Sequence, residues 1–240
     1  MPEETVDYLL RQQIEYYRQR APEYDAWWRR EGRFDRGPEM RAAWEADIGV
    51  AEAALDRFLD ACASKTVLEI ACGTGLWTQR LASRGLQITA LDASPEVIEI
   101  NRARVAGGDV EYAVADVFEW RPPRRFELVF MSFWLSHVPH ARFEAFWKLV
   151  RSALAPGGIA YIIDSAHDPT SHAKDHPVAE RDAEVVTRKL ADERSYRIVK
   201  IFWEPEALEY RLSDCGFEAH ISATPRYFVH GWARPSHQDD

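Results

Sequence analysis

Two glycines and an acid stand where a strand-like apolar run passes into a helical pattern. Residues 67–76 read Val-Leu-Glu-Ile-Ala-Cys-Gly-Thr-Gly-Leu, with Glu69 near the end of the run and Gly73 and Gly75 in the following turn. Glycine has no Cβ, so the chain can turn tightly against a ligand, and the next helix presents unpaired N–H groups. Glu69 would repel a pyrophosphate and attract an ammonium group. The motif therefore favours S-adenosylmethionine, whose methionine part carries an ammonium group, over NAD.

A second acid ends the next predicted strand. Asp92 follows Gly73 by roughly twenty residues, the spacing at which a strand-end carboxylate accepts both hydroxyl hydrogens of a ribose. Asp92 could also act only as a helix cap before Pro95, and one residue can fill both positions. The spacing favours ribose binding.

Residues 69–75, Glu-Ile-Ala-Cys-Gly-Thr-Gly, resemble motif I of the class I S-adenosylmethionine-dependent methyltransferases, and the resemblance covers about Thr66 to Ser165. It implies an enzyme that methylates an O, N, carboxylate or C centre of a small, partly apolar or aromatic metabolite and releases S-adenosylhomocysteine. It also implies cofactor contacts at the strand ends: Ala71 within motif I, Ala93 beside the adenine ring, Asp116 at the adenine amino group, Val117 packed against adenine, and Met131 on the path of the sulfonium.

The N-terminal segment is expected to reach the same site. Residues 16–25, Tyr-Tyr-Arg-Gln-Arg-Ala-Pro-Glu-Tyr-Asp, resemble the lid of many small-molecule methyltransferases, in which a Tyr or Arg reaches the methionine carboxylate. The resemblance assigns this role to Tyr24, with Arg20 as the second choice. The alternative is an amphipathic helix whose aromatic residues, such as Trp27 and Trp28, only pack against the core.

One histidine is a candidate general base. Methyl transfer from a sulfonium needs mainly alignment and exclusion of water, but an acceptor hydroxyl or ammonium must also lose a proton. His137 follows the fourth predicted strand, and a histidine titrates near neutral pH, so we expect His137 to be the catalytic base. A loop histidine that only bonds to the backbone is the alternative.

A polar loop over residues 165–177 is too long for a simple connection and is predicted to overhang the pocket. It contributes His167 as an expected substrate contact, together with Trp134 and Tyr227 from an aromatic set that could shape an apolar pocket. We predict no metal site, because the loop histidines lack a ligand spacing such as His-Glu-x-x-His. Ser132 also stands where metal-dependent catechol-type relatives carry an acid.

Composition limits the partners. The net charge of −9 opposes a broad phosphate-binding surface, and residues 131–134 read Met-Ser-Phe-Trp instead of the Pro-Pro motif of nucleic-acid amino-methylating relatives, so no nucleic acid is expected. No apolar run approaches the length of a membrane span, and three cysteines without paired spacing are typical of the cytoplasm. The predicted partner is a small-molecule substrate, and nothing separates a monomer from a homodimer.

Two other classes of protein were considered. A nicotinamide-dependent oxidoreductase would carry a third glycine where Thr78 stands, and Glu69 is misplaced for a pyrophosphate. A non-catalytic S-adenosylmethionine-binding partner or scaffold would share the motifs, because cofactor motifs report binding and not turnover.

Alternating elements must position these residues. The pattern predicts helices over 5–30, 39–63, 76–83, 95–105, 141–154, 178–192 and 206–215, and strands over 66–71, 87–91, 110–115, 127–131, 159–164 and 196–203, with two more between 218 and 234. This predicts an α/β fold with a mostly parallel seven-stranded sheet and helices on both faces. One domain is expected, with an N-terminal helical lid (1–38), a cofactor-binding core (39–165), an inserted cap after the fifth strand (166–203), a C-terminal helix and strands (204–234) and a tail (235–240).

Overall fold

Seven strands form one mostly parallel sheet in the order β3-β2-β1-β4-β5-β9-β8. The computed structural model of the chain describes residues 3–177 and 180–236. Strands β1 to β5 pair in parallel, whereas β9 runs antiparallel to both of its neighbours. The strands of this sheet are β1 (Thr66–Ile70), β2 (Gln87–Asp92), β3 (Val110–Val114), β4 (Phe126–Ser132), β5 (Leu154–Ser165), β8 (Phe217–Ala223) and β9 (Phe228–Pro235).

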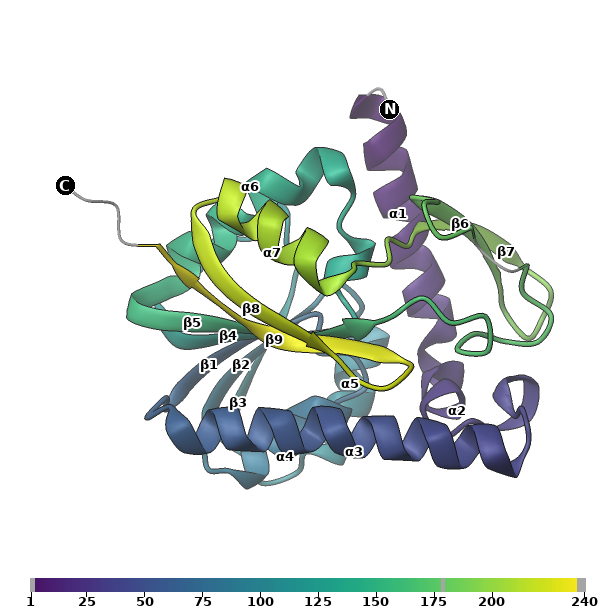
Figure 1. Cartoon of the computed structure of the whole chain (residues 1–240), viewed down its shortest axis with the longest axis horizontal. Coiled ribbons are helices and arrows are strands. Elements are labelled where there is room, and N and C mark those ends of the chain that lie inside the picture. The colour runs from purple at the N-terminus through teal and green to yellow at the C-terminus, as the bar shows by residue number, and fades with distance from the viewer. Residues whose placement is uncertain (1–2, 178–179, 237–240) are drawn as a thin grey trace.

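Helices cover both faces of the sheet, as predicted (Figure 1). Leu68 and Ile70 of β1 pack on one face and Val67 on the other, because successive strand side chains alternate. The face of Leu68 is covered by α6 (His140–Ala153) and α7 (Pro205–Asp214), and the opposite face by α3 (Pro38–Ala61), α4 (Leu76–Ser83) and α5 (Pro95–Arg104). Burial on both faces is typical of parallel sheets.

The N-terminal helix and an inserted hairpin lie together at one end of the sheet (Figure 1). The helix is α1 (Glu3–Arg20), and the hairpin pairs β6 (Val185–Lys189) with β7 (Ser195–Val199). The Val199 N–H donates to Gln13 Oε1 at 3.0 Å, and the Arg197 N–H donates to Gln12 Oε1 at 3.2 Å. Segments far apart in the sequence therefore form one unit.

The segment 5–30 is helical but is not one continuous helix. The helix is interrupted at Pro22, which has no N–H to donate. A short 3₁₀ turn spans Ala21–Glu23, and α2 (Tyr24–Trp28) follows. Asp25 of α2 then accepts hydrogen bonds from Thr74 Oγ1, at 2.8 Å, and from Arg104. These contacts fasten the N-terminal segment to the glycine turn.

The predicted helix over 178–192 is also wrong. Residues 178–179 lie outside the described residues, and β6 occupies the second half of the range. Its sequence Val-Val-Thr-Arg-Lys begins with three β-branched residues, which favour a strand once β7 supplies a partner. Most of the predicted tail, residues 237–240, likewise lies outside the described part of the chain.

Within the described ranges, no helix is both long enough and apolar enough to span a bilayer. Cys62, Cys72 and Cys215 are free thiols.

Candidate active site

The carboxyl ends of β1 and β4 define the site, because the order of the sheet reverses between these two strands. Ala71 follows β1 and has φ 53°, and Phe133 follows β4 with the same φ. Residues other than glycine rarely adopt this left-handed conformation, and such strain is concentrated at functional sites. Both strained residues border the cavities described next.

A first cavity, of about 860 Å³, opens at these strand ends. Its wall includes most of the residues that the sequence assigns to the cofactor: Tyr24, Ala71, Gly73, Asp92, Ala93, Asp116 and Val117. Trp134, expected to contact the substrate, lines this cavity as well. Residues that the motifs scatter along the chain thus meet around one space.

Asp92 joins the second strand to the glycine turn. Its Oδ2 accepts from the Gly73 N–H at 3.1 Å, and its Oδ1 accepts from the Ser94 N–H at 2.9 Å. The cap of α5 is Ser94, whose Oγ accepts from the Val97 N–H. Asp92 is therefore not the helix cap, and its carboxylate faces the cavity. Burial raises the pKa of Asp92.

Gly75 closes the turn without lining the cavity. Its φ is +90°, and a Cβ at this position would lie 2.6 Å from Asn101 Oδ1. The Asn101 amide is itself fixed, because its Nδ2 donates to Gly73 O at 3.1 Å and to Thr78 Oγ1 at 2.8 Å. The second glycine of the motif is thus required by a buried amide that holds the turn.

Glu69 and Met131 lie beneath the cavity and not in its wall. Both side chains are fully buried. The oxygens of Glu69 accept no hydrogen bond from a described residue, and burial raises the pKa of Glu69 to about 8, with Thr78 acting in the opposite direction. Burial therefore favours the neutral carboxyl of Glu69, in contrast to the expected carboxylate beside an ammonium group. Ser132, next to Met131, lines the cavity in its place.

A second cavity, of about 590 Å³, adjoins the first. Tyr17, Tyr24, Phe133 and His137 line both spaces. The second cavity also receives three cationic side chains from peripheral segments: Arg20 of α1, Arg188 of β6, and Lys200, which follows β7.

Arg20 and Arg188 have few polar partners, whereas Lys200 has several. Arg20 lies near the faces of five aromatic rings, and no described residue accepts a hydrogen bond from it. Arg188 is 7% exposed, and its Nη1 has no hydrogen-bond partner. Lys200 donates to Ser136 Oγ at 2.8 Å and lies 3.6 Å from Asp164 Oδ1. The second cavity is consequently cationic.

Sequence analysis missed Arg188 and Lys200, since neither belongs to a motif. The alternation of side chains along a strand does indicate that Arg188 is buried. Val186 and Arg188 share one face of β6, and both are buried. Recognising 185–189 as a strand would have placed a charge on an inward face. Arg20 was expected at the methionine carboxylate, but the structure places it at the second cavity.

His137 lines both cavities, but both of its ring nitrogens are engaged. Nδ1 lies 2.6 Å from Val199 O, and Nε2 lies 2.7 Å from the Tyr17 hydroxyl. Burial and the nearby Lys200 hold the pKa of His137 well below its usual range. This geometry argues against the predicted role of His137 as a free general base.

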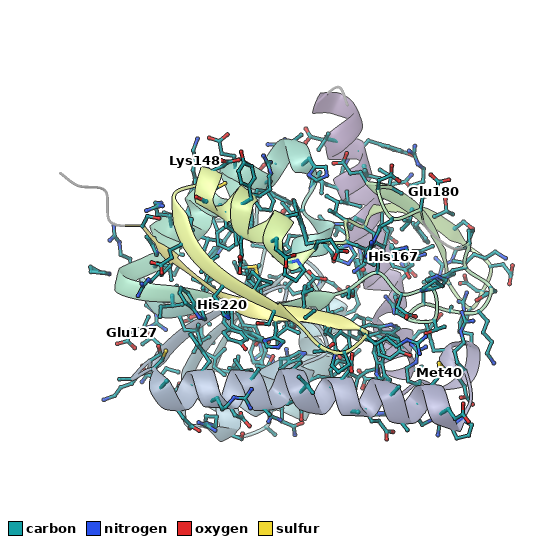
Figure 2. The ribbon with its side chains drawn as sticks, in the orientation of Figure 1. Met40, Glu127, Lys148, His167, Glu180 and His220 are labelled. Atoms are coloured by element: carbon teal, nitrogen blue, oxygen red, sulfur yellow. The ribbon has the colours of Figure 1, made fainter. Side chains whose placement is uncertain are left out.

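The remaining expected substrate contacts lie elsewhere. Tyr227 is buried against Trp44, outside the wall of either cavity, and its hydroxyl lies 3.2 Å from Thr170 Oγ1. His167 lies just after β5 (Figure 2), where its ring packs edge-on against Phe202, a residue of the second cavity. His172 and His176 from the same loop do line the second cavity.

Comparison with known proteins agrees with this geometry. Residues 67–158 match the model of a methyltransferase domain family. The chain is 36% identical to DhpI in its complex with S-adenosylhomocysteine, covering 96% of this chain and 98% of DhpI with a TM-score of 0.72. A complex of DhpI with S-adenosylmethionine and HEP gives 39% identity and the same TM-score, covering 95% of this chain and 98% of that one.

A curated relative is the ubiquinone biosynthesis O-methyltransferase of Xanthomonas euvesicatoria pv. vesicatoria (strain 85-10), 29% identical over 160 residues. That match spans 65% of this chain and 64% of the relative. The glycopeptide N-methyltransferase MtfA, at 21% identity and a TM-score of 0.58 over 78% of this chain and 88% of its own, shares the fold. The chain belongs to the class I S-adenosylmethionine-dependent methyltransferases, as the glycine motif and strand-end acids predict.

Asp92→Ala is expected to weaken S-adenosylhomocysteine binding by at least about 100-fold, because the two charged hydrogen bonds to ribose hydroxyls that we predict for Asp92 would contribute roughly 1.5–3 kcal/mol each. Calorimetric titration measures the change, and urea unfolding tests whether the variant is folded. Asp109→Ala, at an exposed position before β3, is the matched control and should bind normally. Unchanged affinity in folded Asp92→Ala would remove the ribose assignment.

Proposed function

We propose that this methyltransferase acts on an anionic oxygen of a small acceptor, either a carboxylate or a phosphorus oxyanion. The supporting observation is the cationic second cavity, where Arg20, Arg188 and Lys200 line one space and no acid is among the described residues of its wall. The chain as a whole carries a net charge of −9. Buried cations without acidic partners are costly, and an anion that enters their cavity offsets this cost.

The first cavity fits S-adenosylmethionine, because two carboxylates, a glycine turn and apolar side chains line one space. We assign Asp92 to the ribose hydroxyls, Asp116 to the adenine amino group and Tyr24 to the methionine carboxylate. Ala93 and Val117 then bound the adenine ring. When bound, S-adenosylmethionine supplies an electrophilic methyl group.

An ionised acceptor oxygen suits the residues around the junction of the two cavities. Such an oxygen is already a nucleophile, so no side chain has to remove a proton, in agreement with the engaged nitrogens of His137. The task left to the chain is to align the acceptor and exclude water. Methylation removes one negative charge from the acceptor, so the cations hold the product less strongly than the substrate.

The relatives support this proposal in two ways. The complex of DhpI with both S-adenosylmethionine and HEP supports a second ligand site beside the cofactor. The ubiquinone biosynthesis relatives are O-methyltransferases by name, which supports oxygen as the acceptor atom. The cationic groups of this chain further support an acceptor that is negatively charged.

The proposal is tested by incubating the protein with methyl-labelled S-adenosylmethionine and a panel of small carboxylic and phosphonic acids, each paired with its neutral amide or ester. Label is expected only on acids, and inorganic sulfate should compete with them. Transfer only to neutral or amine acceptors, insensitive to sulfate, would contradict an anionic acceptor. S-adenosylmethionine binding without sulfate binding in calorimetry would contradict it as well.

Sulfate affinity is expected to fall as the pH rises through about 8. Burial lowers the pKa of Lys200 to about 8, so its ammonium is lost above this pH, and Asp164, Arg188 and Arg20 are the charged groups that face it. Sulfate does not change its charge in this pH range, so above the pKa of Lys200 the decrease in sulfate affinity can approach tenfold per pH unit. Calorimetric titration from pH 6.5 to 9.5 measures this slope. Lys200→Met should bind weakly with no such slope, and a wild-type affinity independent of pH would contradict the role of Lys200.

A further inference from the structure

The Tyr17 hydroxyl lies where the two cavities meet. Tyr17 and His137 both line the cofactor cavity and the cationic cavity. Their rings are edge-on, with centroids 5.1 Å apart, and Tyr17 Oη lies 2.7 Å from His137 Nε2.

The direction of this hydrogen bond follows from the other side of the imidazole. Val199 O, 2.6 Å from Nδ1, is a carbonyl and can only accept, so Nδ1 carries the proton. Burial keeps the ring neutral, and Nε2 therefore presents a lone pair. The Tyr17 O–H must donate to it, which uses the single proton of the phenol.

Helix α1 holds this arrangement in place. Gln13 lies one turn before Tyr17, and its Nε2 donates to His137 O at 3.1 Å while its Oε1 accepts from the Val199 N–H at 3.0 Å. His137 is thus contacted by α1 at both its backbone and its ring, and by β7 at Nδ1. The position of the Tyr17 oxygen is set by three separate segments.

With its proton committed, the Tyr17 oxygen can only accept. It is repelled by an anionic acceptor and attracted by a positive sulfonium, whose methyl C–H groups are polarised and can form weak C–H···O bonds. We propose that Tyr17 is a catalytic residue whose oxygen contacts the sulfonium methyl group of S-adenosylmethionine and directs it toward the cationic cavity. This inference rests on the proposed function for the placement of the acceptor.

Binding measurements test this role without knowledge of the acceptor, because S-adenosylhomocysteine lacks both the methyl group and the positive charge. Tyr17→Phe is expected to lower affinity for S-adenosylmethionine about twofold to fivefold while leaving affinity for S-adenosylhomocysteine unchanged. A purely structural role would weaken both ligands equally. Tyr8→Phe, the same change at an exposed position of α1, is the matched control and should alter neither affinity.

A second pair of variants guards against misfolding of Tyr17→Phe. His137→Leu removes the acceptor of the phenol proton and should also lower the ratio of the two affinities, whereas His137→Gln, which keeps an acceptor oxygen, should preserve it. An unchanged ratio in folded Tyr17→Phe, or in folded His137→Leu, would overturn the role of Tyr17. Wild-type protein that bound S-adenosylmethionine and S-adenosylhomocysteine but no sulfate would contradict only the proposal of an anionic acceptor. The ratio of the two affinities would still test the contact between Tyr17 and the methyl group.

Discussion

Arg188→Met is expected to lower kcat/KM for an anionic acceptor by roughly 100-fold or more, because losing one partner of a buried charge contact costs about 2–5 kcal/mol. Arg188 is 7% exposed, and its unpaired Nη1 belongs to the cationic cavity. Methionine fills similar space without charge. The same variant should lose sulfate binding in calorimetry while binding S-adenosylhomocysteine normally, since Arg188 does not line the first cavity.

Arg197→Met provides the matched control for this variant. Arg197 is exposed on β7, the other strand of the same hairpin, where it pairs with Thr187. The Arg197→Met variant should retain full activity and sulfate binding. Equal behaviour of the two variants would show that the charge of Arg188 does not hold the acceptor.

Glu69→Gln is expected to stabilise the cofactor-free protein at pH 8 relative to wild type, on the order of 4 kcal/mol. The pKa of Glu69 is raised from 4.5 to about 8 in the folded protein, so folding binds a proton between these values. The stability supplied by the protonated carboxyl is complete below pH 4.5 and is lost as the pH rises through 8. Glutamine does not titrate, so the advantage of the variant should grow by about 1.4 kcal/mol per pH unit in this window.

Urea unfolding at a series of pH values measures this difference. Glu111→Gln, exposed on β3, is the control and should follow wild type. Parallel stability curves for Glu69→Gln and wild type would disprove the raised pKa. If Glu69 serves the ammonium group of the cofactor, the stabilised variant should also bind S-adenosylmethionine more weakly than wild type.

The cofactor half of the site could be predicted from the sequence because its determinants are local. Gly73 is placed by a turn, Asp92 ends β2, and Asp116 lies two residues beyond the end of β3, so parallel pairing is enough to bring them to one edge of the sheet. The alternation of side chains along a strand also explains why some predicted residues do not line the cavity. Glu69 is close to the turn in sequence, but its side chain points to the α4 face and lies below the cavity.

The acceptor half could not be predicted, because it depends on contacts between distant segments. Arg20, Arg188 and Lys200 come from α1, β6 and the chain after β7, and nothing in their spacing relates them. A helix over 178–192 does not have the two-residue alternation of β6, and this alternation is what places Arg188 on the buried face. His137 illustrates the same difficulty: its position after β4 was evident, but only the tertiary structure shows that Tyr17 and Val199 occupy its ring nitrogens.

The three cationic groups all lie outside residues 67–158, the region that matches the methyltransferase domain family. The residues that we propose for holding the acceptor thus lie outside the stretch of chain that matches the family. Substitutions at these three positions are expected to change which molecule is methylated without altering the lining of the cofactor cavity, because none of the three residues lines that cavity. A library confined to Arg20, Arg188 and Lys200 is therefore a rational starting point for giving this scaffold a new acceptor, and acceptor preference is expected to diverge among relatives faster than cofactor use.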